Sequence, residues 1–405
     1  MHKPELLAPC GNFSKLKTAL YYGADAVYVG GKNFSLRSFA DNFSIDELND
    51  ATAYCHENGK KLYVTANIYA KNSDFPSICD YFKELDGIGV DGLIISDPGI
   101  FSVAKKYAPH TDLHVSTQAN TLNKHSAAFW ADLGAKRIIL ARELSLDEIK
   151  EIRDFLPDSV ELEAFIHGAM CISYSGRCLL SDYFSHRSSN RGECVQACRW
   201  NYQIREKSKD GMFYDLEEDD RGSYVLNSKD LNMINHIDEM VSSGICSFKI
   251  EGRMKSEYYL ATVINAYRRA IDNYLEFGSK YKENPLFFNE VLKTNHRAFT
   301  TAYCFGDNHE TVNYSDTQSI GERIFVATVT DYDAEKKRAR IEMRNRFKTG
   351  DKLEVLTPGD YLNSVITVYK MENEQGEQVN DAKRVQETLF IETDIPLKAG
   401  DILRK

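Results

Sequence analysis

The sequence has no long hydrophobic run and no leader-like start. No stretch of about 18 apolar residues occurs anywhere in the 405 residues, so we expect no membrane-spanning helix. The first residues, Met1-His2-Lys3-Pro4, do not form the apolar segment that directs secretion. We therefore expect a cytoplasmic protein whose cysteines stay reduced rather than forming disulfides.

Several common catalytic motifs are also missing. There is no H-E-x-x-H for zinc and no G-x-S-x-G around a nucleophilic serine. No G-x-G-x-x-G follows the first expected strand, which argues against a dinucleotide-binding fold. Basic residues are in deficit, 50 against 60 acidic ones, giving a net charge of −10. Any nucleic-acid binding must therefore come from a local basic patch rather than from the whole surface.

The first 250 residues repeat one pattern, in which a helical segment ends at a glycine and an apolar run follows. The glycines Gly23, Gly89, Gly134 and Gly244 each stand where a helix C-cap is expected, just before a buried strand. Eight candidate strands result, near Leu6–Ala8, Val27–Gly30, Leu62–Asn67, Leu93–Ser96, Leu113–Gln118, Ile138–Arg142, Val160–His167 and Phe248–Glu251. This number predicts a (β/α)₈ TIM-like barrel, with a doubly wound open sheet as the alternative.

Several of these strands alternate between apolar and polar residues, although parallel strands buried on both faces usually read as continuous apolar runs. If the apolar sets face the helices, polar side chains line the barrel interior, namely Asn67, His114, Gln118, Glu163, His167, Lys249 and Glu251. Burying them is costly unless they satisfy one another or bind a ligand. The sequence therefore predicts either an internal network, such as a Glu163–Lys249 pair, or a pocket for a small polar ligand at the C-terminal rim.

Four of the nine cysteines fall within 28 residues with the spacing C-x₆-C-x₁₅-C-x₃-C, at Cys171, Cys178, Cys194 and Cys198. Zinc ribbons favour pairs separated by two to four residues, and only Cys194 and Cys198 come close. Iron–sulfur clusters take four thiolates and tolerate wide, irregular spacing. An iron–sulfur cluster, a zinc site and unrelated buried thiols all remain as interpretations of the spacing.

The pattern changes from about Ile320, where short strands and tight turns predict a small all-β barrel of about 85 residues. Its basic residues recur at even positions, at Arg338, Arg340, Arg344, Arg346 and Lys348. A two-residue period would place this charge on one face of a strand. Such a face is either a solvated edge or a contact for RNA phosphates.

The cysteine segment also resembles a known family. Glu163-x-Phe165-x-x-Gly168-Ala169-Met170-Cys171, continuing through Gly176-x-Cys178-x-Leu180-Ser181, is similar to the signature of the collagenase-like peptidase family U32. Phe184-x-His186-Arg187 and Cys194-x-x-x-Cys198-Arg199-Trp200 resemble the branch tied to tRNA hydroxylation. The resemblance implies an iron–sulfur enzyme, with a 4Fe–4S cluster, that converts the wobble uridine of tRNA to 5-hydroxyuridine and requires prephenate.

This resemblance suggests roles for the residues already singled out. The four cysteines would bind the cluster at the C-terminal face of the barrel. Glu163 and His167, adjacent on one strand face, are candidates for general acid–base catalysis, and His167 could instead orient the cysteine loop. The two carboxylates of prephenate suggest basic partners at the strand ends, for which Arg37, Arg142, Lys249 and Arg253 are candidates. Together with the polar interior, the candidate substrate-binding residues are Asn67, His114, Gln118, Arg142, Lys249, Glu251 and Arg253.

We expect residues 1–318 to form the barrel, carrying the cysteine-rich loop at 168–200, and residues 319–405 to form the small β-barrel that could contact RNA. One alternative is a collagenase-like peptidase. A Cys171–His167 nucleophilic pair is conceivable for it, but the other three cysteines would be unexplained. A second alternative is a zinc-stabilised factor that binds tRNA without modifying it.

Overall fold

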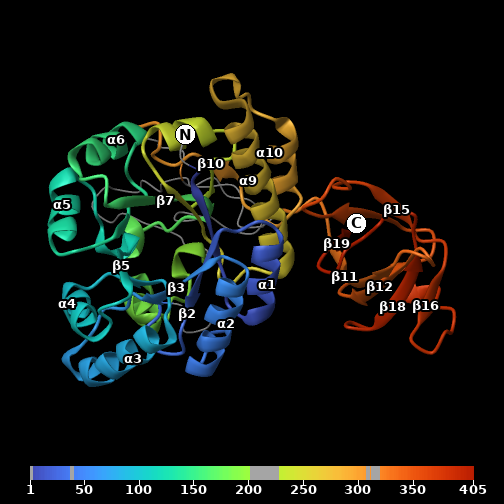
Figure 1. The fold of residues 1–405 in the computed structure, drawn as a ribbon, viewed down its shortest axis with the longest axis horizontal. Helices are drawn as coiled ribbons and strands as arrows, with labels where there is room; N and C mark the ends of the chain where they lie inside the picture. The colour runs from blue at the N-terminus through green and yellow to red at the C-terminus, as the bar shows by residue number, and fades with distance from the viewer. Residues whose placement is uncertain (1–2, 37–40, 201–227, 307–310, 312–319) are drawn as a thin grey trace, which may run out of the picture.

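The computed structural model describes residues 3–36, 41–200, 228–306, 311 and 320–405. The expected domain boundary between residues 318 and 319 and the candidate carboxylate partner Arg37 lie outside the described residues. Figure 1 shows a barrel surrounded by helices and, beside it, a smaller domain built from strands.

Parallel strands close the larger domain into a barrel. Each strand pairs with the next, and β9 pairs with both β1 and β7, which completes the ring. The eight strands are β1 (Glu5–Pro9), β2 (Ala26–Gly30), β3 (Lys61–Ala66), β4 (Gly92–Ile95), β5 (Asp112–Val115), β6 (Arg137–Ile139), β7 (Glu161–Ala169) and β9 (Ser247–Ile250). The predicted (β/α)₈ barrel is confirmed, and the open-sheet alternative is wrong.

Two further short strands extend the barrel at β7. The strand β8 (Asp230–Asn232) runs antiparallel to the end of β7, and β10 (Phe299–Thr300) pairs with β8. Because β8 pairs with the last residues of β7, it lies beside the start of the cysteine segment, which follows β7 directly.

The helices bury apolar stripes against the outside of the barrel. They are α1 (Phe13–Tyr21), α2 (Ile45–Glu57), α3 (Phe75–Ile88), α4 (Pro98–Tyr107), α5 (Lys124–Asp132), α6 (Leu146–Phe155), α8 (Ile237–Ser242), α9 (Glu257–Phe277) and α10 (Pro285–Leu292). Capping boxes at Ser44 and Ser145 start α2 and α6. The α3 helix ends at Gly89, whose φ of 79° is the left-handed conformation expected of a C-cap. Among the described residues, no helix combines the length and apolar character needed to cross a bilayer.

The smaller domain is an antiparallel sheet with its own apolar core, which includes Val326, Ile341 and Leu353. The main sheet contains β11 (Phe325–Asp333), β12 (Arg338–Met343), β14 (Lys352–Leu356), β15 (Val365–Thr367), β16 (Met371–Asn373), β18 (Thr388–Glu392) and β19 (Ile402–Arg404), and β13 (Phe347–Lys348) pairs separately with β17 (Asp381–Ala382). The predicted small all-β domain is confirmed.

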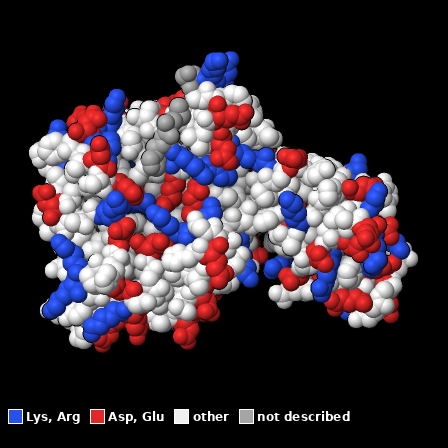
Figure 2. All heavy atoms as spheres, in the orientation of Figure 1, with Lys and Arg blue, Asp and Glu red and all other residues white. Residues whose placement is uncertain are grey.

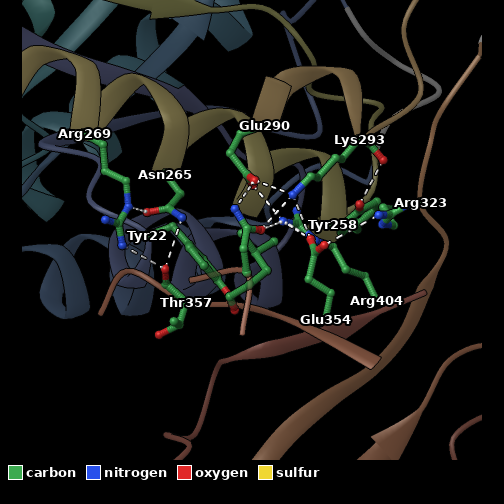
Figure 3. Close-up of polar contacts among 12 residues, drawn as sticks. Tyr22, Tyr258, Asn265, Arg269, Glu290, Lys293, Arg323, Glu354, Thr357 and Arg404 are labelled. Atoms are coloured by element: carbon green, nitrogen blue, oxygen red, sulfur yellow. Dashed lines mark hydrogen bonds and ion pairs between the residues drawn. The ribbon is translucent and has the colours of Figure 1, made fainter. Parts of the chain in front are cut away.

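A buried polar cluster joins the two domains (Figure 3). Arg404 of β19 reaches Glu290 of α10, and Lys293 just after that helix contacts both Glu290 and Glu354 of β14. Arg269 of α9 donates to the carbonyl oxygens of the segment 357–359 in the smaller domain. Buried charges tolerate little displacement of their partners, so this cluster fixes how the domains meet.

Candidate active site at the barrel mouth

The inner layer of the barrel is filled by a network of buried charges. Arg137 of β6 donates to Glu5 at 2.6 Å, to Glu163 at 3.0 Å and to Glu161 at 2.8 Å. Lys249 of β9 donates to the other oxygen of Glu163 at 2.7 Å. The predicted Glu163–Lys249 pair is therefore confirmed, but the sequence analysis missed Arg137. Its signal was a position two residues before Ile139, which places both side chains on the same face of β6.

Glu163 is fully buried within this network. It lines neither of the two pockets found at the C-terminal end of the barrel. Burial lowers the pKa of Lys249, and Glu163 offsets only part of that effect. The two carboxylate oxygens of Glu163 thus bind Arg137 and Lys249. Glu163 is therefore poorly placed to exchange a proton with a ligand.

Above this network, the barrel opens into a pocket of about 70 Å³. Its polar lining includes six of the seven predicted substrate-binding residues, namely Asn67, Gln118, Arg142, Lys249, Glu251 and Arg253. Gln118 belongs to the short turn after β5, and Arg142 to the loop after β6. The predicted polar pocket at the C-terminal rim and the predicted internal network therefore exist together, in successive layers.

His114 is the predicted substrate-binding residue that the structure does not bring to this pocket. It lies lower in β5, with its ring 4.7 Å from that of Tyr63, and is almost completely buried. Its pKa falls well below 6.5 because of burial first and then because of Arg137 and Lys249. The strand ends at Val115, so only residues of the following turn reach the rim.

His167 and Glu163 do not share a face of β7, and that expectation is wrong. A β-bulge between Phe165 and His167 shifts the register against β9, so His167 turns away from the interior that Phe165 faces. The His167 ring instead packs against Tyr267 of α9 and Phe299 of β10, at 5.4 and 5.5 Å between ring centroids. Burial lowers its pKa to about 3, so the imidazole is neutral near pH 7.

A second pocket, of about 260 Å³, continues outward from the first. The two share Gln118, Arg142 and Glu251. The outer pocket is lined by all four of the spaced cysteines, at positions 171, 178, 194 and 198. The barrel mouth and the cysteine loop therefore enclose one continuous space.

The cysteine loop is held in place by contacts of its own. Asn190 accepts a hydrogen bond from the backbone of Cys178 at 3.3 Å and donates back to its carbonyl oxygen at 3.0 Å. Arg191 pairs with Asp74 at 2.9 Å, which ties the loop to the segment after β3. Gly168 has a φ of 109°, and a Cβ there would stand 2.6 Å from the carbonyl oxygen of Glu251. Glycine is thus required where β7 leaves the barrel.

The thiols have surroundings that suit metal-bound thiolates. All nine cysteines lie in the described residues, and all are free thiols. The sulfurs of Cys171 and Cys178 accept hydrogen bonds from the backbone N–H groups of Ser173 and Leu180, at 3.4 and 3.3 Å. Burial raises the pKa values of Cys171 and Cys198, and the nearby Arg142 and Arg199 oppose this rise.

The spacing of the side chains bears on which metal group fits. Within the described parts of the chain, no three histidine, cysteine or carboxylate side chains are grouped closely enough to hold one metal ion. Zinc needs four ligands at about 2.3 Å from a single centre. The four cysteines line one pocket of about 260 Å³, and four thiolates are the donor set that an iron–sulfur cluster takes.

Two polar atoms at the pocket suggest a second ligand. The Nε of Arg142 and the Oε1 of Gln118 are buried and have no hydrogen-bond partner among the described residues. Arg142 is held by the carbonyl oxygen of Ala169 at 2.9 Å and lies 4.0 Å from the Phe165 ring centroid. Buried polar atoms are nearly always satisfied in native proteins, so these two indicate a ligand or ordered water.

The outer pocket also has basic residues that the sequence analysis missed. Arg199, Lys255 and Arg297 line it. Arg297 is paired with Asp230 of β8. Burial lowers the pKa of Lys255, with Asp230 acting in the opposite direction. Only the tertiary structure brings Arg297 here, since it follows the cysteines by about a hundred residues.

The basic residues of the small domain do not form the predicted single face. The strand β12 ends at Met343, so the basic residues from Arg344 onward no longer follow the two-residue period of that strand. Most of the predicted cations are paired with carboxylates, Arg338 with Glu372, Arg340 with Glu374, Arg344 with Glu257 and Glu342, and Arg346 with Asp381. Figure 2 accordingly shows basic and acidic residues interspersed on this domain. An RNA contact by these residues and Lys348 stays a prediction.

Known proteins resemble this chain over nearly its whole length. It is 38% identical to tRNA hydroxylation protein P1 of Bacillus subtilis, covering 100% of this chain and 95% of the relative. It is 36% identical to tRNA hydroxylation protein P of Escherichia coli, covering 93% and 91%. It is also 30% identical to a collagenase of Porphyromonas gingivalis, covering 87% and 86%.

The sequence profiles of one family account for both domains. Residues 11–314 match the profile named peptidase family U32, and residues 322–404 match that of its C-terminal domain. The first span covers the cysteine loop and every strand of the barrel after β1, and the second covers the antiparallel sheet. The chain therefore belongs to peptidase family U32.

Proposed function

We propose that this protein is a tRNA-modifying enzyme that hydroxylates the wobble uridine to 5-hydroxyuridine. In this proposal prephenate is the required metabolite and a 4Fe–4S cluster is the cofactor. The observation that carries it is the continuous space in which four cysteines meet the basic residues of the barrel mouth. The near full-length similarity to proteins named for tRNA hydroxylation supports the same assignment.

The four cysteines of the loop would hold the cluster, which when bound supplies electron transfer beside the substrate. With four protein thiolates as ligands, no iron position is left for substrate. The loop's own contribution is to fix the thiols, through the N–H groups of Ser173 and Leu180 that donate to the sulfurs of Cys171 and Cys178. Arg142 and Arg199 oppose part of the rise that burial imposes on the pKa values of Cys171 and Cys198.

The inner pocket suits a small dicarboxylate. Arg142 has a buried donor without a partner among the described residues. Arg253, on the other side of the pocket, is oriented by Ser35 at 2.8 Å and by Thr65 at 3.1 Å. Two guanidinium groups, one in the loop after β6 and one in the segment after β9, can each bind one carboxylate, which is the charge pattern of prephenate.

Glu251 takes the place of Glu163 as the carboxylate closest to the proposed chemistry. It lines both pockets, whereas Glu163 is enclosed by Arg137 and Lys249. We propose that Glu251 accepts or returns the proton when the target base reacts in the outer pocket. His167 supports this arrangement by packing behind the end of β7.

The structure does not bring together the Cys171–His167 pair that the peptidase alternative would use. Cys171 lines the outer pocket, while His167 packs among Tyr259, Tyr267 and Phe299 on the other side of β7. A base on the opposite side of the strand cannot activate that thiol. A zinc-stabilised tRNA-binding factor would predict one zinc per chain and no change in tRNA nucleosides.

Nucleoside analysis of tRNA tests the proposal. We expect 5-hydroxyuridine and its derivatives to be absent in cells lacking this chain and to return with the wild-type copy. Copies with Cys171→Ala or Arg142→Ala should fail to restore them. A Cys79→Ala copy is the matched control, since Cys79 lies on α3 away from the pocket. Unchanged nucleosides in the deletion strain would contradict the proposal.

A further inference from the structure

A ridge of exposed apolar side chains runs along the outside of the cysteine loop. It consists of Leu179, Tyr183, Phe184 and Trp200, which are exposed by 74%, 76%, 44% and 44%. We call these four residues the aromatic ridge. Its rings are contiguous, with centroids 5.0 Å apart for Tyr183 and Phe184 and 6.1 Å apart for Phe184 and Trp200. Exposed clusters of this kind usually mark an interaction site.

The ridge is held on a rigid support. Leu179 and Tyr183 lie on one side of α7 (Leu180–Ser185), linked by the hydrogen bond from the Tyr183 N–H to the Leu179 carbonyl at 2.9 Å. Ser181 accepts a hydrogen bond from the backbone N–H of Val195 at 3.2 Å, which binds α7 to the later part of the loop. The rings are therefore presented to solvent with little freedom to collapse.

The ridge adjoins the outer pocket. Leu180 and Ser181 of α7 line that pocket, while their neighbours Leu179 and Tyr183 are exposed. At the far end, Arg199 lines the pocket and Trp200 belongs to the ridge. If one unit of a polymeric ligand enters the outer pocket, the units on either side of it would lie across these side chains.

The charge around the ridge favours a polyanion. Residues 171–200 contain four arginines, Arg177, Arg187, Arg191 and Arg199, against two acidic residues, Asp182 and Glu193, in a chain whose net charge is −10. Arg191 is paired with Asp74, and the other three arginines still outnumber the two acidic residues. Aromatic rings beside arginines are the usual means of holding unpaired bases, because every base has a π-face and every phosphate a charge. A docking site for an apolar protein segment would not need this local excess of arginine.

We propose that the aromatic ridge stacks the unpaired bases that flank the target nucleotide of the substrate RNA. This inference rests on the proposed function, since it assumes that the nucleotide entering the outer pocket belongs to an RNA loop. It assigns recognition of single-stranded RNA to the cysteine loop, in addition to any contact made by the small domain.

The test measures binding without turnover. The probes are a fluorescent RNA hairpin with a loop the length of an anticodon loop and a fully paired RNA of the same length. We expect Tyr183→Ala and Trp200→Ala to weaken binding of the hairpin by about 5- to 100-fold each, the usual range for loss of one stacked base. Tyr183→Phe should bind like the wild type because it keeps the ring. Binding of the paired RNA should change little.

Tyr369→Ala is the matched control, because Tyr369 is 83% exposed on the small domain. If Trp200→Ala does not fold, the result for Tyr183→Ala decides the test. The Tyr183 side chain is so exposed that its removal should cost little packing. An unchanged Kd for the hairpin, or an equal loss for both RNAs, would overturn the proposal. If the Tyr183→Ala and Trp200→Ala variants lose tRNA modification but bind the hairpin like the wild type, the ridge would be a contact for an electron-donor protein. That result would also overturn the proposal. A failure of the proposed function appears separately, as unchanged tRNA nucleosides.

Discussion

Arg404, in the last strand of the small domain, donates to Glu290 on α10 of the barrel at 2.8 Å, and both side chains are almost completely buried. The same guanidinium reaches Glu354 at 2.7 Å, and Lys293 reaches Glu290 at 2.6 Å (Figure 3). This cluster holds the two domains in one arrangement.

Removing Arg404 should destabilise the protein strongly. Arg404→Met leaves Glu290 with Lys293 as its remaining cation and Glu354 with Lys293 and the longer Arg323 contact at 3.7 Å. Loss of one partner of a buried pair costs about 3–5 kcal/mol. Urea unfolding measures this loss. Arg340→Met is the control, because Arg340 and Glu374 form a largely exposed pair, whose loss should cost less than about 1 kcal/mol. Equal effects of the two substitutions would show that the interface does not depend on this cluster.

The same cluster predicts a loss of stability in acid. Burial alone would raise the pKa of Glu290, but Arg404 and Lys293 outweigh it and hold the pKa below the ordinary 4.5. A carboxyl with a lowered pKa in the folded state stabilises the fold fully above pH 4.5. That contribution disappears as the pH falls through the lowered value.

Thermal unfolding of wild type and Glu290→Gln between neutral and acidic pH measures this. The wild type should be more stable than the variant above the ordinary pKa of Glu290, and the difference should shrink as the pH falls further. A difference that is constant across this range would contradict the assigned ionisation.

His167 should stay neutral throughout the physiological range. Its pKa of about 3 in the folded protein, against an ordinary 6.5, means that unfolding takes up a proton at any pH between these values. The histidine therefore contributes full stability above pH 6.5 and less as the pH falls toward 3. NMR of the imidazole should show no titration between about pH 5 and 8. A midpoint near 6.5 would restore the acid–base role that the sequence suggested.

Arg142 should control binding of the small carboxylate ligand. Arg142→Ala removes a buried donor, and the loss of a charged hydrogen bond predicts about 10- to 100-fold weaker binding of prephenate. Arg142→Lys should recover only part of the affinity, because an ammonium group does not reproduce the guanidinium fork. Isothermal titration calorimetry measures both, with Arg346→Ala of the small domain as control. Unchanged affinity in Arg142→Ala would remove this residue from the binding site.

The sequence was sufficient to predict the barrel, the small β domain and the polar mouth, because strand periodicity and glycine C-caps are local signals. It was not sufficient for His167, since a single inserted residue in β7 reverses the face of every residue that follows. The prediction of a single basic face on the small domain failed for a different reason. Their partners Glu372, Glu374 and Asp381 lie more than thirty residues further along the chain, so only folding brings them together.

The outer pocket shows the same limit. The four cysteines were recognised by their spacing, but Lys255 and Arg297 reach them from other segments of the chain. Their positions depend on β8, β10 and the segment after β9, and no periodic pattern predicts this meeting.

The most direct test of the account is the metal and sulfide content of anaerobically purified protein, for the wild type and for Cys→Ser variants at positions 171, 178, 194 and 198. We predict about four irons and four sulfides per chain in the wild type and a brown colour with broad absorption near about 400 nm. Each of the four substitutions should reduce all three, while Cys79→Ser should not. A colourless wild-type protein with one zinc per chain, or an iron content indifferent to these four cysteines, would contradict the account.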